Sequence, residues 1–215
     1  MAPPPGNSSL DWTKRGVVPP VHDQGAMGSA NAFAAIAAIE SARTIVSGEL
    51  IELSMQELVD CGAATGFLNE VFAWVTKNGL CSAADYPSRP TPGPCQKHMC
   101  KSKVSINGTA SVAAKDEDAL LLAVNNSPVL VAVEADKTPF QMYQGGVLSS
   151  PDCGTQVDHA LLLVGYGTDS GTDYWKLQNS WGSDWGEAGY IRLARGSNVC
   201  GVALDASYPV GVRPT

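Results

Sequence analysis

The sequence predicts an α+β fold with two lobes, a helical lobe followed by an antiparallel β-barrel-like lobe, and a cleft between them. Helical spacing and helix caps dominate the first half of the chain, whereas short β-rich runs dominate from about residue 104 onward. The 215 residues, 44% apolar and 16% charged, suit such a compact protein. We expect residues 1–113 to form an N-terminal arm and the helical lobe, and residues 114–215 to form the β-rich lobe, with a C-terminal tail that returns to the helical lobe.

Three helices are predicted in the first half. The first follows Ser29, a favourable N-cap residue, and continues with helical spacing through an alanine-rich segment as far as Arg43. The second begins with the capping-box pattern Ser-Met-Gln-Glu at 54–57. The third spans 68–77 and ends at an Asn-Gly pair. The first helix is long enough to be the central one.

The strands are predicted from short apolar runs in the second half. These runs are rich in β-branched and aromatic residues, which favour a pleated, half-buried surface. A Pro-rich stretch at 87–94 predicts a loop in the helical half. The four clearest strand candidates lie at 129–133, 161–166, 174–177 and 190–193.

Composition excludes two classes of partner. The formal charge is −7 and the three His are scattered, which argues against binding to a nucleic-acid backbone. No apolar run approaches the roughly 18 to 20 residues that a membrane-spanning helix requires. We therefore expect neither a nucleic-acid partner nor a membrane span.

Three separated motifs identify a family resemblance. Residues 24–33 read Gln-Gly-Ala-Met-Gly-Ser-Ala-Asn-Ala-Phe, residues 157–160 read Val-Asp-His-Ala, and residues 178–182 read Gln-Asn-Ser-Trp-Gly. In this order they resemble the active-site segments of papain-like cysteine peptidases of the cathepsin L-like kind. The resemblance covers nearly the whole chain and implies the papain-like fold, with no cofactor and no resident metal.

The resemblance assigns four chemical roles. Ala30 occupies the position of the nucleophilic Cys, and a methyl group can neither attack a carbonyl nor be activated by a base. His159 matches the general base, and Asn179 matches the residue that orients its imidazole. Gln24 matches the donor to the developing oxyanion. Three roles therefore keep their residues, and the nucleophile is lost.

The same resemblance implies a peptide-binding groove. Gly66 should pair with a substrate backbone, and Asp205 either lies at the base of a side-chain pocket or is an exposed loop charge. Thr65 replaces a Gly where the substrate passes, so binding should be weakened. Trp181 should shield Asn179. The other expected substrate-binding residues are Phe67, Leu68, Ala132, Asp158 and Ala160.

Several departures from the family pattern occur together. One family disulfide is missing at both ends, because Met27 and Ala63 occupy the expected half-cystine positions. Asn31 replaces the Trp that normally follows the nucleophile. A laboratory change of the nucleophile would not alter these positions, so natural divergence is favoured over an engineered Cys-to-Ala substitution.

The six Cys favour an oxidising compartment. By motif position, the resemblance implies that Cys61 pairs with Cys95 and Cys153 with Cys200. Cys81 and Cys100 are left over, and a third bridge between them is plausible. A metal site built from Cys95, His98 and Cys100 is the rival interpretation, but its spacing matches no common zinc motif.

These observations predict a catalytically inactive papain-like protein that acts by binding a peptide or protein, as a scaffold or assembly subunit. We expect it in the secretory pathway, extracellular space or a lysosome- or vacuole-like compartment. The alternatives are a cysteine endopeptidase inactivated by an engineered change at Ala30, or a cleft in which His159 performs acid/base chemistry without a covalent step. Ser29 is a poor substitute nucleophile, because an N-cap oxygen turns toward the backbone.

Overall fold

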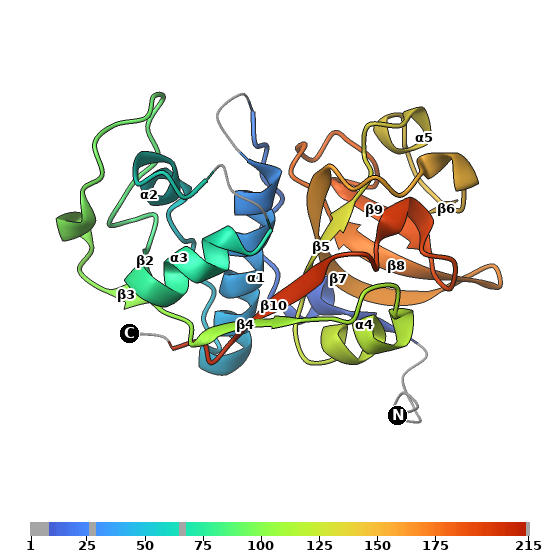
Figure 1. Cartoon of the computed structure of the whole chain (residues 1–215), viewed down its shortest axis with the longest axis horizontal. Helices are drawn as coiled ribbons and strands as arrows, with labels where there is room; N and C mark the ends of the chain where they lie inside the picture. The colour runs from blue at the N-terminus through green and yellow to red at the C-terminus, as the bar shows by residue number, and fades with distance from the viewer. Residues whose placement is uncertain (1–8, 26–28, 65–67, 214–215) are drawn as a thin grey trace.

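A long central helix lies between two lobes in the computed structural model, which describes residues 9–25, 29–64 and 68–213 (Figure 1). This helix, α1, spans Ala30–Ser47. The helical lobe adds α2 (Met55–Asp60) and α3 (Glu70–Asn78), and an eight-stranded sheet dominates the other lobe. The predicted two-lobed α+β fold is confirmed.

The helix ends follow local capping signals, although α1 continues four residues beyond the predicted Arg43. The Ser54 hydroxyl accepts the Glu57 backbone N–H at 3.0 Å and so caps α2. Helix α1 ends where Gly48 adopts a left-handed conformation and its N–H bonds to the Thr44 carbonyl. Helix α3 begins two residues later than expected and ends at Gly79. Local sequence chemistry therefore sets the length of these helices.

Ser29 departs from the expectation. It precedes α1 with extended backbone, but its hydroxyl makes no capping hydrogen bond. The first turn is instead joined by the bond from the Phe33 N–H to the Ser29 carbonyl, at 3.0 Å. The expectation that the Ser29 oxygen is held by the backbone is therefore wrong.

The longest strand of the sheet, β7, lies at its centre. Strand β7 (His159–Asp169) pairs antiparallel with β5 (Val129–Val133) and β8 (Thr172–Gln178), and β9 (Tyr190–Ala194) follows β8. The order is β4 (Gly108–Ser111), β10 (Ala206–Val210), β5, β7, β8, β9 and β6 (Val147–Leu148), with the β6–β9 pair parallel, and the eighth strand pairs with β7 outside this order. All four predicted strand runs lie within β5, β7, β8 and β9.

The N-terminal strand crosses to the β-rich lobe. Strand β1 (Leu10–Asp11) pairs with β7 opposite Tyr166 and Gly165. A side chain at Gly165 would collide with the Leu10 carbonyl, so only glycine permits this approach. The first residues described thus pack on the lobe formed by the last part of the chain.

Alternating residues of the central strands enter two hydrophobic cores. Val129, Val131 and Val133 of β5 join the core of the β-rich lobe around Trp175. The intervening Leu130 and Ala132 face the second core, which includes α1 and α3. Both faces of β5 are therefore buried, which explains its uninterrupted apolar sequence.

The C-terminal segment joins the two lobes. Strand β10 (Ala206–Val210) pairs with β5 and with β4 (Gly108–Ser111), and both β4 and β10 run across the front of the lower part of α1 toward the helical lobe in Figure 1. A further bridge joins Ser105 to Arg213. The remaining elements are η1 (Trp12–Arg15), β2 (Leu80–Cys81), η2 (Lys97–Met99), β3 (Lys103–Val104), α4 (Glu117–Val124), α5 (Thr138–Gln141), β6 (Val147–Leu148), η3 (Pro151–Cys153) and η4 (Val199–Gly201).

Candidate active site

A histidine and an asparagine from neighbouring strands form the centre of the site. His159 begins β7, and Asn179 follows the last residue of β8. The His159 Nε2 atom lies 2.7 Å from the Asn179 Oδ1 atom. Asn179 is 3% exposed, so this pair is protected from water. The two residues that the sequence placed together do meet in the structure.

The surrounding bonds fix the tautomer of the histidine. The Asn179 Oδ1 atom also accepts the Ser180 backbone N–H at 2.8 Å, which requires an oxygen at that position. His159 Nε2 must then donate its proton to this oxygen. In the neutral ring, Nδ1 therefore carries the free lone pair and is the atom able to accept a proton.

Burial lowers the pKa of the His159 imidazole below its ordinary value of 6.5, while the Asn179 hydrogen bond and the Asp158 charge oppose this effect. Asp158 is exposed, and its carboxylate accepts the Ala135 backbone N–H at 2.7 Å. The imidazole is thus neutral at neutral pH. It is suited to act as a base or as a hydrogen-bond acceptor.

Aromatic rings cover the histidine. The Trp181 ring centroid lies 4.9 Å from the His159 ring centroid, and Phe140 contacts both rings edge-on. Trp185 stacks on Phe140 at 5.3 Å. Such rings exclude water and hold the imidazole in one orientation. Trp181 therefore shields the His159–Asn179 pair, as its motif position predicted.

Gln24 is held by Ser180. Its backbone N–H donates to the Ser180 carbonyl at 2.9 Å, and the Ser180 hydroxyl donates to its Oε1 atom at 2.6 Å. Because Oε1 is the acceptor, the amide N–H groups are left available as donors. The oxyanion role that the resemblance implies for Gln24 stays a prediction.

Ala30 is the first residue of α1, where backbone N–H groups point out of the helix end. It is half-buried and packs against the second hydrophobic core. In the described part of the chain, no hydrogen bond joins Ser29 to His159, so nothing there activates the Ser29 hydroxyl. The side chain of Ala30 is a methyl group, and its assignment to the nucleophile position stays a prediction of the resemblance.

The expected pocket residues are partly assembled. Ala132 and Ala160 are direct partners across β5 and β7, and both join Leu68 in the second core. Asp205 has an exposed side chain, and its carbonyl accepts the Ala132 N–H at 2.9 Å. Asp205 thus lies beside this group with its carboxylate in solvent. The expectations for Met27, Thr65, Gly66 and Phe67 fall on residues outside the described part.

Three disulfides join the expected cysteines: Cys61 with Cys95, Cys81 with Cys100, and Cys153 with Cys200. Since Cys95 and Cys100 are bonded to other cysteines, neither offers a thiolate to a metal with His98, and that rival interpretation is wrong.

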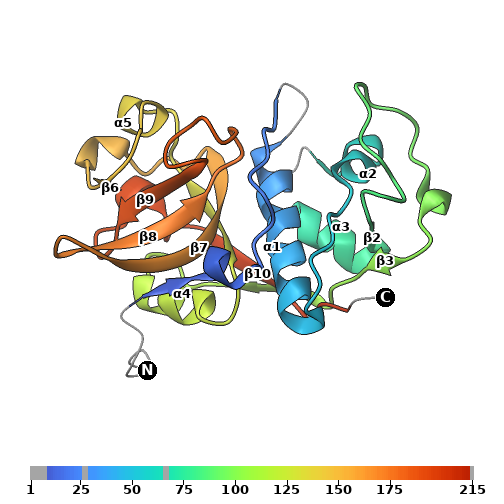
Figure 2. The same ribbon diagram turned by 180° about the vertical axis from the view of Figure 1, so that it is seen from behind.

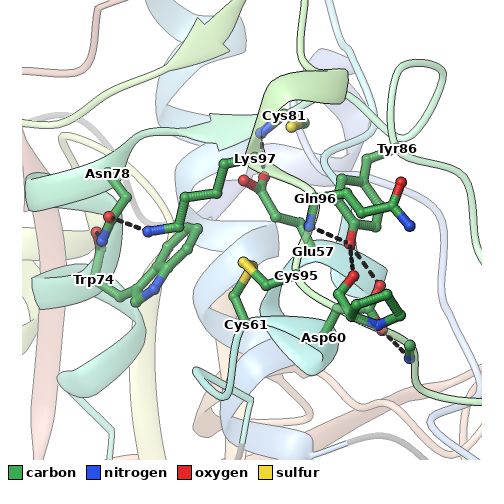
Figure 3. The surroundings of a disulfide bond; sticks show 12 residues. Glu57, Asp60, Cys61, Trp74, Asn78, Cys81, Tyr86, Cys95, Gln96 and Lys97 are labelled. Carbon is green, nitrogen blue, oxygen red and sulfur yellow. Dashed lines mark hydrogen bonds between the residues drawn. A yellow bond between two sulfur atoms is a disulfide. The ribbon is translucent and has the colours of Figure 1, made fainter.

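Figure 3 shows the first bridge among polar contacts. The Tyr86 hydroxyl donates to Asp60 at 2.6 Å. The Lys97 ammonium group donates to Asn78 and lies over the Trp74 ring. These contacts secure the long loop that the bridge closes.

Sequence reasoning missed two supporting residues. Ser180 lies within a recognised motif, but its bond to Gln24 spans 156 positions and becomes visible only in the fold. Phe140 follows a Pro in the short helix α5, and no local pattern distinguishes it from an ordinary core residue. Both act by holding a residue of the site in place.

The fold and the His–Asn pair define a papain-like protein. Residues 6–210 match the papain family of cysteine proteases, and the chain belongs to that family. Germination-specific cysteine protease 1 of Arabidopsis thaliana is 46% identical over 96% of this chain, and cysteine proteinase COT44 of Brassica napus is 45% identical over 96%. The chain spans 58% and 66% of the length of these relatives.

Solved structures show the same fold. The bromelain protease from Ananas comosus, in complex with the E64 inhibitor, is 40% identical and superposes with a TM-score of 0.88. The match covers 95% of this chain and 99% of that one. The cysteine protease CMS1MS2 of Carica candamarcensis, in complex with E-64, is 38% identical, with a TM-score of 0.87 and the same coverage. No helix among the described residues is long and apolar enough to cross a membrane.

Proposed function

We propose that this chain is a papain-family protein that has lost proteolysis and acts by binding a peptide or protein partner. The observation that carries the proposal is Ala30, which stands in the motif at the nucleophile position and has no group able to attack a carbonyl. All six cysteines are bonded in disulfides, so none offers a thiol as a substitute nucleophile, which supports the proposal. Without a nucleophile, a bound peptide would be held and released intact.

The hydrogen bonds around His159 and Gln24 favour a cleft that still binds peptides over one that has lost both cleavage and binding. The His159–Asn179 bond and the Gln24–Ser180 bond both persist with short distances. Trp181 still covers the imidazole. These groups would be free to hydrogen-bond a peptide carbonyl without cleaving it. The substitutions at Asn31 and Thr65 lead us to expect weaker binding than in proteolytic relatives.

Three disulfides support a location in an oxidising compartment. We therefore place the protein in the secretory pathway, outside the cell or in a vacuole- or lysosome-like organelle. A partner in this setting would be an extracellular or vacuolar polypeptide. The acidic charge of −7 favours a partner with basic segments.

One experiment tests both halves of the proposal. A defined mixture of synthetic peptides is incubated with the protein, the complex is isolated by gel filtration, and bound and unbound peptides are identified by mass spectrometry. We expect a subset of peptides to be enriched at full length, with no new termini in either fraction.

Two outcomes would contradict the proposal. New termini that disappear in the His159→Ala variant would show acid/base cleavage without a covalent step. The absence of any enriched peptide would show that the cleft no longer binds. A heat-unfolded sample provides the control for nonspecific adsorption.

A further inference from the structure

Glu40 is a buried carboxyl group, and one of its two oxygens is available to accept a hydrogen bond from a ligand. It lies on α1, and 2% of its surface is exposed. Its Oε1 atom accepts the Leu53 backbone N–H at 2.6 Å. Its second oxygen has no hydrogen-bond partner in the part of the chain that the structure describes. An ionised carboxylate in this position lacks the compensation that burial normally requires.

The other buried carboxylates of the chain are paired. Three acidic residues are buried among those described, namely Glu40, Glu57 and Glu134. Glu57 lies 3.3 Å from the Lys103 ammonium group, and Glu134 lies 3.0 Å from the Lys137 ammonium group. In the described part of the chain, no Lys or Arg forms an ion pair with Glu40. Glu40 thus differs from the other two buried carboxyl groups, because no cation of the described chain compensates its charge.

A cavity of about 210 Å³ opens beside Glu40. A single water molecule needs only about 10–15 Å³ of such space, so the cavity can hold a larger group. Phe33, Ile36 and Leu53 contribute apolar walls, while the exposed Asp23 and Glu52 add negative charge. Among the described residues that line it there is no Lys or Arg, and His22 is the only basic one. In the ribbon view of Figure 2, α1 is flanked by the blue segment that follows η1 and by the segment that leads to α2.

The pKa of Glu40 is consistent with a buried carboxyl group that has no cation beside it. Burial raises the pKa of Glu40 to about 8, the Glu52 charge adds to the increase, and the bond from Leu53 opposes it. A positive group placed beside the free oxygen would favour the ionised carboxylate. It would therefore lower this pKa.

We propose that this cavity binds a primary ammonium group carried on a short alkyl chain. The buried carboxylate recognises the charge, and the apolar walls contact the alkyl chain. Phe33 and Tyr86 add aromatic surface, which attracts cations.

A metal ion fits less well. In the described chain, the single group of ligand atoms close enough to hold a metal is Glu57 with Cys81 and Cys100, and it does not include Glu40. Hard cations also require several converging oxygens, whereas apolar side chains form much of this cavity.

This site adjoins the region of the candidate active site but does not include His159. Neither His159 nor Ala30 lines it. It shares His22, Phe33 and Ala37 with a smaller cavity of about 20 Å³ that reaches Asn179 and Ser180. The proposal therefore does not depend on whether the chain cleaves peptides.

Calorimetric titration with n-butylammonium chloride at constant ionic strength tests the proposal. We expect saturable binding to the unchanged protein and at least a tenfold loss of affinity in Glu40→Gln, which keeps an oxygen for the Leu53 N–H. Glu52→Gln, at the exposed rim, should change affinity by less than about threefold. Butan-1-ol, which lacks the charge, should not bind. Equal affinity in the unchanged protein and Glu40→Gln would overturn the proposal.

A second measurement uses the unchanged protein and so does not depend on a variant folding. The Glu40 carboxyl carbon is titrated with pH by NMR, with and without n-butylammonium. Binding should shift the titration midpoint to lower pH. Below the midpoint, affinity should increase about tenfold for each unit by which the pH is raised, because more of the carboxyl group is ionised. Above the midpoint, affinity should no longer change with pH. The other charged or titratable groups of the described chain around this cavity are Asp23, Glu52, His22, Tyr86 and the neighbouring Arg43 on α1. An unchanged midpoint at saturating amine would refute the site.

Discussion

The ligand-free protein should lose stability as pH rises because of Glu40. Burial raises the pKa of this group from 4.5 to about 8. The folded state therefore retains a proton that the unfolded chain releases in this window. The stabilising contribution is complete below pH 4.5 and is lost as pH rises toward 8. At about 1.4 kcal/mol per pKa unit, the difference between 4.5 and about 8 means that Glu40 can contribute at most about 5 kcal/mol to the free energy of unfolding.

The Glu40→Gln variant isolates this effect. Glutamine keeps an oxygen for the Leu53 N–H but does not titrate. Urea denaturation at intervals from pH 4 to 9 should show that the free energy of unfolding of the variant, relative to the unchanged protein, increases steadily with pH. Titrations common to both proteins, including that of His159, cancel in the difference. Glu52→Gln is the control, because the exposed Glu52 charge has the smallest of the effects on the Glu40 pKa, so this variant should show a much weaker trend with pH.

A difference between Glu40→Gln and the unchanged protein that does not vary with pH would refute the reasoning. It would mean that Glu40 titrates in the folded state as it does in the unfolded chain. The raised pKa, and the argument that its charge lacks compensation, would then both fail.

Two further predictions concern the helical lobe. Lys103→Met should destabilise the protein by about 2–4 kcal/mol in urea denaturation, because it leaves Glu57 buried without its cation. The same substitution at the exposed Lys101 should have little effect, and equal effects would contradict the ion-pair argument. Non-reducing peptide mapping should find Cys81 joined to Cys100, whereas a free thiol at either position would remove that bridge.

The sequence predicted the fold well where its signals were local or both faces of a strand were buried. The run Val129–Val133 coincides with β5 because alternate residues enter two cores, so every position is apolar. The capping pattern at Ser54 was equally reliable, because the bond it predicts spans three residues. The Ser29 cap failed because preference for a position does not guarantee that the side-chain bond forms there.

The site was predictable only as far as its motifs extend. His159 and Asn179 were identified because each lies in a distinctive segment, and their bond follows from the pairing of β7 with β8. The Gln24–Ser180 bond and the Glu40 cavity depend on chain crossings that no local pattern encodes. The pairing of β1 with β7 is a similar case, since a two-residue strand carries almost no periodicity.

We propose that Ala30 leaves the site without a nucleophile, although His159, Asn179 and Gln24 are all present. A peptidase assay tests it with three proteins: the unchanged chain, Ala30→Cys, and a variant that adds Asn31→Trp, Met27→Cys and Ala63→Cys to that change. Loss of a nucleophile in a comparable triad costs about a millionfold in turnover. Each protein is also incubated with a thiol-directed epoxide and weighed intact by mass spectrometry.

We predict no turnover and no epoxide adduct for the unchanged chain. Ala30→Cys should regain little activity, because small misplacements of the groove and helix start cost large factors in rate. The fourfold variant should regain much more, with one adduct per molecule. Turnover by the unchanged chain that His159→Ala abolishes would contradict the claim. Full activity from Ala30→Cys alone would instead show that the chain differs from an active peptidase at that position only.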